Sequence, residues 1–156
     1  MITIRELKKS DINYIEELIS YESKHYYQFL SIGWSTSQIL SQLKKKTNYS
    51  FGLFYKNYLV SFIIGDLFNI EKISEYEILL LYVCKFFRKK GLGTKLINQI
   101  EINNSCLKKI YLEVSKNNSD AILFYKKMKF KTVYIRKSYF SFENKKIDAL
   151  AMTKIY

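Results

Sequence analysis

A basic, glycine-containing turn follows an apolar stretch in the middle of the chain, and its composition suits the binding of an anion. Three consecutive cations at positions 88–90 precede Gly91 and Gly93, and apolar residues at helical spacing follow. Glycine permits left-handed backbone conformations and the close approach of a ligand. The first N–H groups of a helix lack partners within the helix and attract negative charge. We therefore predict a loop that binds a pyrophosphate, with a helix beginning near Leu92.

The spacing of the glycines excludes two common phosphate-binding motifs. The P-loop requires Gly-x-x-x-x-Gly-Lys-Ser/Thr, which is absent around Gly91. The dinucleotide-binding motif requires a third glycine three residues after the second, where this chain has Leu96. The remaining pattern, Arg88-x-x-Gly91-x-Gly93 after an apolar strand, resembles the coenzyme A loop of the GCN5-related N-acetyltransferase (GNAT) family.

Hydrophobic periodicity predicts an α/β protein in the order β-α-α-β-β-β-α-β-α-β-β. A strand begins near residue 2, Ser10-Asp11 would cap the first helix, and a second helix begins near Thr36. Lys56-Asn57 is expected to connect two strands as a hairpin. The remaining expected elements are strands at 49–55, 58–68, 77–83, 109–114, 130–136 and 146–154, and a helix at 120–128.

Two further segments resemble the same family. The pattern Leu112-Glu113-Val114-x-x-x-Asn118-x-x-Ala121-x-x-x-Tyr125-x-x-x-x-Phe130 is similar to the second half of the acetyltransferase signature. The segments 136–140 and 148–152 resemble the closing part of the RimI-type enzymes, which acetylate the N-terminal alanine of a small-subunit ribosomal protein. The resemblance covers residues 77–152 and implies a GNAT fold, a mixed and mostly antiparallel sheet flanked by helices. We expect a single domain over residues 1–156.

The resemblance implies that acetyl-CoA is the co-substrate and that no metal takes part. In this family the pantetheine arm pairs with the strand before the loop, and the N–H of Val83 would polarise the thioester carbonyl. Thr94 could add a hydroxyl to the pyrophosphate turn. The cofactor-binding residues implied are Leu81, Tyr82, Val83, Arg88, Lys89, Lys90, Gly91, Leu92, Gly93, Thr94, Asn118 and Tyr125.

The same resemblance assigns catalytic roles to two residues. Glu113 occupies the position of the general base, which removes a proton from the amine through water, and Tyr125 that of the general acid for the thiolate. Glu77, on the preceding strand, is the rival base. An α-ammonium has a pKa near 8 and lysine near 10.4, so deprotonating an N-terminus at neutral pH costs roughly 3 kcal/mol less. Tyr139 corresponds to a tyrosine in the loop between the last two strands that contacts the incoming peptide.

Some residues have structural explanations as well. Asn118 could be only a helix cap, and His25 has no partner motif. Cys84 could carry an acyl group in a ping-pong scheme, although we expect Cys84 and Cys106 to be reduced core residues. Family members usually have Gly-Phe after the tyrosine-bearing helix, whereas this chain has Lys129-Phe130. Lysine at a position that favours glycine should cost of order 1 kcal/mol, unless the helix ends differently.

A net charge of +12 raises the question of nucleic acid as a partner. The lysine pairs are scattered, and the abundance of lysine, isoleucine, asparagine and tyrosine is typical of an A/T-rich genome, so we do not expect nucleic-acid binding. A basic ribosomal tail would be repelled unless Glu16, Glu17 and Glu22 form a local acidic patch. No apolar run is long enough to span a membrane, and we expect a cytoplasmic protein.

The sequence therefore predicts an N-acetyltransferase that transfers acetyl directly to the N-terminal alanine of a ribosomal small-subunit protein. One alternative is a GNAT enzyme that acts on a small amine or an antibiotic. Another is a non-catalytic acyl-CoA-binding module that keeps the loop without the chemistry.

Overall fold

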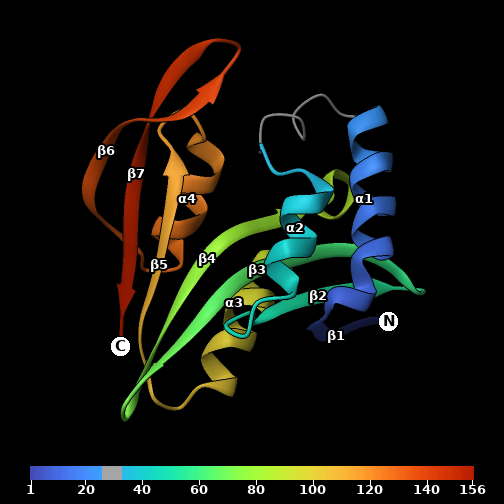
Figure 1. Ribbon diagram of the computed structural model, residues 1–156, viewed down its shortest axis with the longest axis horizontal. Coiled ribbons are helices and arrows are strands. Elements are labelled where there is room, and N and C mark those ends of the chain that lie inside the picture. The colour runs from blue at the N-terminus through green and yellow to red at the C-terminus, as the bar shows by residue number, and fades with distance from the viewer. Residues whose placement is uncertain (26–32) are drawn as a thin grey trace. The chain divides into compact units, whose positions relative to one another are not determined.

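The computed structural model describes residues 1–25 and 33–156 (Figure 1). Short 3-10 turns cover Lys9–Asp11 and Lys85–Phe87. Among the described helices, none combines the length and the apolar character that a membrane crossing requires. The helices and strands are β1 (Ile2–Leu7), α1 (Ile12–His25), α2 (Thr36–Leu43), β2 (Ser50–Tyr55), β3 (Tyr58–Ile70), β4 (Ile73–Val83), α3 (Leu92–Asn103), β5 (Leu107–Ser115), α4 (Ser119–Lys127), β6 (Lys131–Phe142) and β7 (Lys145–Ile155).

In the part of the chain that the structure describes, seven strands are hydrogen-bonded in the order β1-β2-β3-β4-β5-β7-β6. The pairs β1 with β2, β2 with β3, β5 with β7 and β6 with β7 are antiparallel, whereas β4 and β5 run parallel. Parallel neighbours need a crossover connection, and α3 lies in the connection between β4 and β5. The sequence-based prediction of a mixed, mostly antiparallel sheet flanked by helices is confirmed.

The chain forms two compact units, of which the first comprises Met1–Leu67 and Leu79–Ser105. Helices α1 and α2 lie on one face of its strands and α3 on the other (Figure 1). Each helix buries an apolar face at the spacing that the sequence predicted. The largest fully buried side chains of this unit are Phe62, Leu7, Ile15, Ile39, Leu53, Ile63, Ile64, Leu96, Ile97 and Ile100.

The second unit comprises Phe68–Ile78 and Cys106–Tyr156. Residues alternate between the two faces of β5, as the period of a strand requires, so that Ile110 and Leu112 are buried while Tyr111 and Glu113 lie on the opposite face. Register places Leu112 beside Met152 of β7, which is fully buried. Strand β6 lies at one edge of the sheet, and most of its residues are exposed.

The expected hairpin between β2 and β3 is confirmed. Lys56 and Asn57 have φ values of 47° and 69°, the left-handed pair that a two-residue turn of type I′ requires. Helix α2 begins after Ser35, whose hydroxyl accepts the N–H of Gln38 at 3.2 Å in a capping box.

Other boundaries differ from the prediction. Strand β4 begins at Ile73 and not at residue 77, because residues 74–78 pair with β5. Strand β6 continues to Phe142, beyond the predicted end at residue 136. The expected cap at Ser10-Asp11 is also wrong, because a 3-10 turn precedes α1. The Asp11 carboxylate accepts the N–H of Lys8 and pairs with Arg5, both at 2.9 Å.

Helix α4 ends at Lys127, two residues before Lys129, the lysine that stands in place of the usual glycine. Lys129 has a φ of 73°, in the left-handed region. The N–H of Phe130 donates to the carbonyl of Tyr125 at 3.0 Å, and the rings of these two residues lie 5.4 Å apart. This bond and the apolar contact are the features of a Schellman C-cap. The helix therefore has the C-terminal geometry for which glycine is preferred, but the left-handed position is occupied by Lys129.

We expect Lys129→Gly to raise the free energy of unfolding by about 1 kcal/mol, because glycine adopts this conformation without a steric cost. Urea unfolding monitored by circular dichroism measures the change. Lys126→Gly, within the same helix, is the matched control and should lower stability by about 1 kcal/mol. A loss of stability in Lys129→Gly would contradict the strain at this position.

Candidate functional site

The glycine turn of the first unit has the backbone that an anion-binding loop needs. Gly91 precedes α3 with a φ of 76°, and a Cβ built on it would meet no atom within 4 Å. Lys89 is also left-handed, at 59°. Gly93 differs from the expectation, because it lies inside the first turn of α3, is buried and has no positive φ. Only Gly91 needs the conformational freedom of glycine in this turn.

This loop fits a diphosphate. The open space in front of Gly91 adjoins the beginning of the twelve-residue helix α3, where backbone N–H groups and the helix dipole favour negative charge. Leu92, Gly93 and Thr94 form the first turn of this helix, and Arg88, Lys89 and Lys90 are exposed before it. These residues would hold the diphosphate of acetyl-CoA.

The strand that leads into the loop already uses two of its carbonyl groups. The carbonyl of Tyr82 accepts the hydroxyl of Ser61 at 2.9 Å, and that of Val83 accepts Nε of Arg88 at 3.0 Å. The side chain of Tyr82 is buried, whereas Leu81 and Val83 are half-buried. Arg88 is therefore turned back along its own strand.

Three further residues of the first unit, Cys84, Glu22 and His25, lie outside the glycine turn. Cys84 is buried, and burial raises the pKa of its thiol, which makes it a poor acyl carrier. Glu22 is not part of a surface acidic patch: it is 1% exposed, and its Oε1 accepts the N–H of Lys85 at 2.8 Å. His25 lies against Tyr21 with the rings stacked at 4.4 Å.

Glu113 is the centre of a polar cluster in the second unit. Its Oε1 accepts the hydroxyl of Tyr111 at 2.5 Å and Nη1 of Arg136 at 2.9 Å. The hydroxyl groups of Tyr111 and Tyr134 lie 3.1 Å apart. The Glu113 side chain is only 11% exposed and lies on an interior strand, so it is not a solvated carboxylate on the edge of the sheet.

The surroundings of Glu113 keep it ionised. Burial acts to raise the pKa of the carboxyl, but hydrogen bonds from Tyr111, Arg136 and Tyr139 outweigh burial, and the pKa lies below its usual value. Burial and the neighbouring Glu113 raise the pKa of Tyr111. At neutral pH the Glu113 carboxylate therefore lies beside the neutral hydroxyl of Tyr111.

Tyr139 joins this cluster from a different element than expected. It lies within β6, not in the loop between the last two strands, because the hairpin turns at Glu143 and Asn144. The guanidinium carbon of Arg136 lies 4.0 Å from the centre of the Tyr139 ring. Burial raises the pKa of the Tyr139 hydroxyl, and Glu113 and Glu77 add to this effect.

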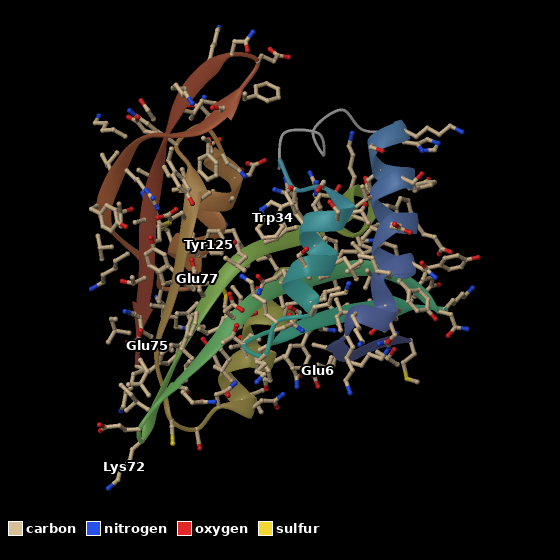
Figure 2. All side chains as sticks on the ribbon, in the orientation of Figure 1. Glu6, Trp34, Lys72, Glu75, Glu77 and Tyr125 are labelled. Atoms are coloured by element: carbon tan, nitrogen blue, oxygen red, sulfur yellow. The ribbon has the colours of Figure 1, made fainter. Side chains whose placement is uncertain are left out.

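Glu77 and Glu75 lie on β4 (Figure 2). Register places Glu77 beside Tyr111 and Glu75 beside Lys109, with which Glu75 forms an ion pair at 3.2 Å. Glu77 is half-buried and acts electrostatically on Tyr139. The rival base thus borders the same cluster as Glu113.

Helix α4 carries the other two predicted residues. Tyr125 is 7% exposed, and burial raises the pKa of its hydroxyl. Asn118 is the N-cap: its Oδ1 accepts the N–H of Ala121 at 3.2 Å. The cap uses the amide oxygen of Asn118 and leaves its NH₂ group available to a ligand.

Sequence reasoning missed three residues of the cluster, namely Tyr111, Tyr134 and Arg136, and also Asp148 of β7, whose carboxylate accepts the N–H of Ser138. Tyr111 precedes Glu113 by two residues, so strand alternation alone could have placed them on one face. Arg136 and Asp148 lay within the quoted motifs but had no assigned role. Their contacts depend on the register of β6 against β7, which the sequence does not specify locally.

A family model and several solved structures are similar to this chain. The model of the acetyltransferase (GNAT) family matches residues 12–130. The ribosomal-protein-S18-alanine N-acetyltransferase of Escherichia coli has a similar structure, with a TM-score of 0.80 and 22% identity over 99% of this chain and 94% of that one.

Two plant structures share the fold. Arabidopsis thaliana NAA60 in complex with acetyl-CoA has a TM-score of 0.78 and 18% identity, over 99% of this chain and 98% of that one. Arabidopsis thaliana Naa50 in complex with the bisubstrate analogue CoA-Ac-MVNAL has a TM-score of 0.74 and 20% identity, over 99% of both chains. These structures share the fold, and the family model, which matches more than half of the chain, shows that this chain belongs to the GNAT family of acetyltransferases.

Proposed function

We propose that this protein transfers an acetyl group from acetyl-CoA to the α-amine of a protein N-terminus, with N-terminal alanine as the preferred acceptor and a small-subunit ribosomal protein as the target. The observation that carries the proposal is the carboxylate of Glu113, held by Arg136 and Tyr111 beside Tyr139. The Escherichia coli protein of the same fold is an alanine N-acetyltransferase of a ribosomal protein, which supports this acceptor. The proposal places the reaction in the cytoplasm.

The chemistry requires one proton to leave the amine and one to reach the sulfur. The amine nitrogen bonds to the acetyl carbon while the bond from that carbon to sulfur breaks. Glu113 accepts the amine proton through water, and Tyr125, whose raised pKa keeps it protonated, donates a proton to the departing thiolate. The N–H of Val83 is the candidate donor to the carbonyl oxygen.

The low basicity of Glu113 favours an α-amine over a lysine. A carboxylate that Arg136 and Tyr111 already stabilise has less affinity for a proton. An acceptor whose own ammonium has a pKa near 8 therefore suits this site better than one near 10.4, by roughly 3 kcal/mol of deprotonation cost. The Arg136 cation further favours the neutral form of an amine that lies near it.

The decisive test incubates the purified protein with acetyl-CoA and a short peptide that begins with alanine and contains an internal lysine. We expect intact-mass spectrometry to show the addition of one acetyl group, at the N-terminus. The same peptide with a blocked N-terminus is the control and should stay unmodified. Faster acetylation of lysine or of a small amine would favour the alternative acceptors, and binding of acetyl-CoA without any product would favour a non-catalytic module.

We expect Gly91→Ala to weaken acetyl-CoA binding about tenfold in calorimetry. Alanine at a φ of 76° costs about 1 to 2 kcal/mol, so the turn would relax away from the geometry that holds the diphosphate. Gly33→Ala is the matched control, because Gly33 has a φ of 75° and also faces open space. Equal losses in the two variants would show that strain alone, and not the loop, sets the affinity.

We expect Glu113→Gln to lower kcat by about a hundredfold or more, as loss of a general base does. In the wild type, kcat/KM for an alanine peptide should rise with pH until about 8, where the acceptor loses its proton. On the acidic side, protonation of Glu113 should lower kcat/KM further only when the pH falls below the lowered pKa of this carboxyl. Initial rates over this pH range give the profile.

Glu75→Gln is the control for this experiment, because Glu75 is a half-buried carboxylate of the same unit that pairs with Lys109. It should leave kcat within about twofold. A hundredfold loss in Glu77→Gln, with activity retained in Glu113→Gln, would transfer the role of base to Glu77.

A further inference from the structure

Strand β6 contains an irregular segment at the position of Tyr139. Arg136 pairs with Ala149 and Phe140 pairs with Ile147, so residues 137–139 of β6 lie opposite the single residue Asp148 of β7. Ser138, in the middle, has a φ of 53°, which is left-handed. We call residues 137–139 the acceptor bulge.

Asp148 contacts the acceptor bulge through both carboxylate oxygens. Its Oδ1 accepts the N–H of Ser138 at 2.9 Å, and its Oδ2 pairs with Nζ of Lys137 at 3.2 Å. The N–H of Ser138 is the largest cause of the lowered pKa of Asp148. The carbonyl of Asp148 also accepts the N–H of Lys116, in the turn before α4, at 2.9 Å. Asp148 therefore connects the bulge to the rest of its unit.

The bulge decides which side of the strand Tyr139 occupies. Residues three apart in a regular strand point to opposite faces, so Arg136 and Tyr139 would not meet. In this structure the guanidinium of Arg136 lies 4.0 Å from the centre of the Tyr139 ring, and the same guanidinium binds Glu113 at 2.9 Å. The left-handed residue between them turns the chain and brings Tyr139 to the Glu113 side.

A left-handed serine requires compensation. For residues other than glycine, the left-handed conformation costs roughly 1 to 2 kcal/mol of conformational free energy. At Ser138 the hydrogen bond to the Asp148 carboxylate offsets the cost, since a bond to a charged acceptor is stronger than one to a neutral acceptor.

We propose that Asp148 is a positioning residue for the acceptor: by holding Ser138 left-handed, its carboxylate places Tyr139 over Arg136 beside Glu113, where the incoming N-terminal peptide would contact it. This inference rests on the proposed function for the role of Tyr139. The placement of Tyr139 itself depends only on contacts within β6 and β7.

The test compares Asp148→Ala, Asp148→Asn and the double variant Asp148→Ala with Ser138→Gly. We expect Asp148→Ala to raise KM for the alanine peptide about tenfold, a change that corresponds to ~1.4 kcal/mol. The KM for acetyl-CoA should stay unchanged. Asparagine retains an oxygen that accepts the Ser138 N–H, so Asp148→Asn should stay within about threefold of the wild type. Glycine at 138 needs no compensation, so the double variant should recover most of the loss.

Lys137→Ala is the matched control. It removes the ion pair to Asp148 but leaves the bond to Ser138 in place, and an exposed ion pair contributes little. It should leave both KM values unchanged. A tenfold effect in Lys137→Ala, or no recovery in the double variant, would overturn the role assigned to the left-handed serine.

A measurement that needs no activity separates this inference from the proposed function. In NMR spectra, contacts between the Tyr139 ring and the Arg136 side chain should be present in the wild type, in Asp148→Asn and in the double variant, and should disappear in Asp148→Ala. If no peptide is acetylated, the proposed function fails while the spectra still test the bulge. Contacts that persist in Asp148→Ala would overturn the inference, whatever the activity.

Discussion

The second compact unit depends on the pairing of the partly buried Glu113 carboxylate with Tyr111 and Arg136. A charge at 11% exposure is costly unless it is paired and hydrogen-bonded. One partner, Tyr111, stands two residues away on the same strand, but Arg136 lies 23 residues further along the chain. A slip of β6 by one residue would turn Arg136 to the other face. The need to pair this carboxylate therefore favours one register of the outer strands.

The same pairing limits the chemistry of the unit. Hydrogen bonds that stabilise the Glu113 carboxylate also reduce its affinity for protons. If Glu113 is the general base, as we propose, its low basicity suits an amine that is already partly neutral at pH 7 better than a lysine. In the proposed function, the stability of this unit and its preference among acceptors would thus have a common electrostatic origin at Glu113.

The sequence predicted the elements well where local rules decide the structure. The glycine turn before α3 and the Lys56-Asn57 hairpin follow from backbone preferences that act over a few residues. Membership of the GNAT family followed from the spacing of motif residues, and the family match confirms it. The roles of Glu113 and Tyr125 remain predictions, which the proposed experiments test.

The sequence did not predict the partners of Glu113 or the position of Tyr139. Both depend on the pairing of β6 with β7, where three residues lie opposite Asp148. No glycine in the sequence marks this irregularity, because the left-handed residue is Ser138, whose N–H donates to the Asp148 carboxylate of β7. The boundary of β6 was wrong for the same reason: alternation is interrupted at the bulge, and the strand then continues to Phe142.

The outer position of β6 has a consequence for the behaviour of the protein in solution. An edge strand with Val133, Tyr134 and Ile135 about half exposed offers backbone groups and apolar surface to a strand of another molecule. Lys131, Arg136 and Lys137 and the bulge at 137–139 interrupt that edge, and charges and bulges are the features that discourage edge-to-edge aggregation. The segment that presents Tyr139 thereby also protects the fold against intermolecular β-pairing.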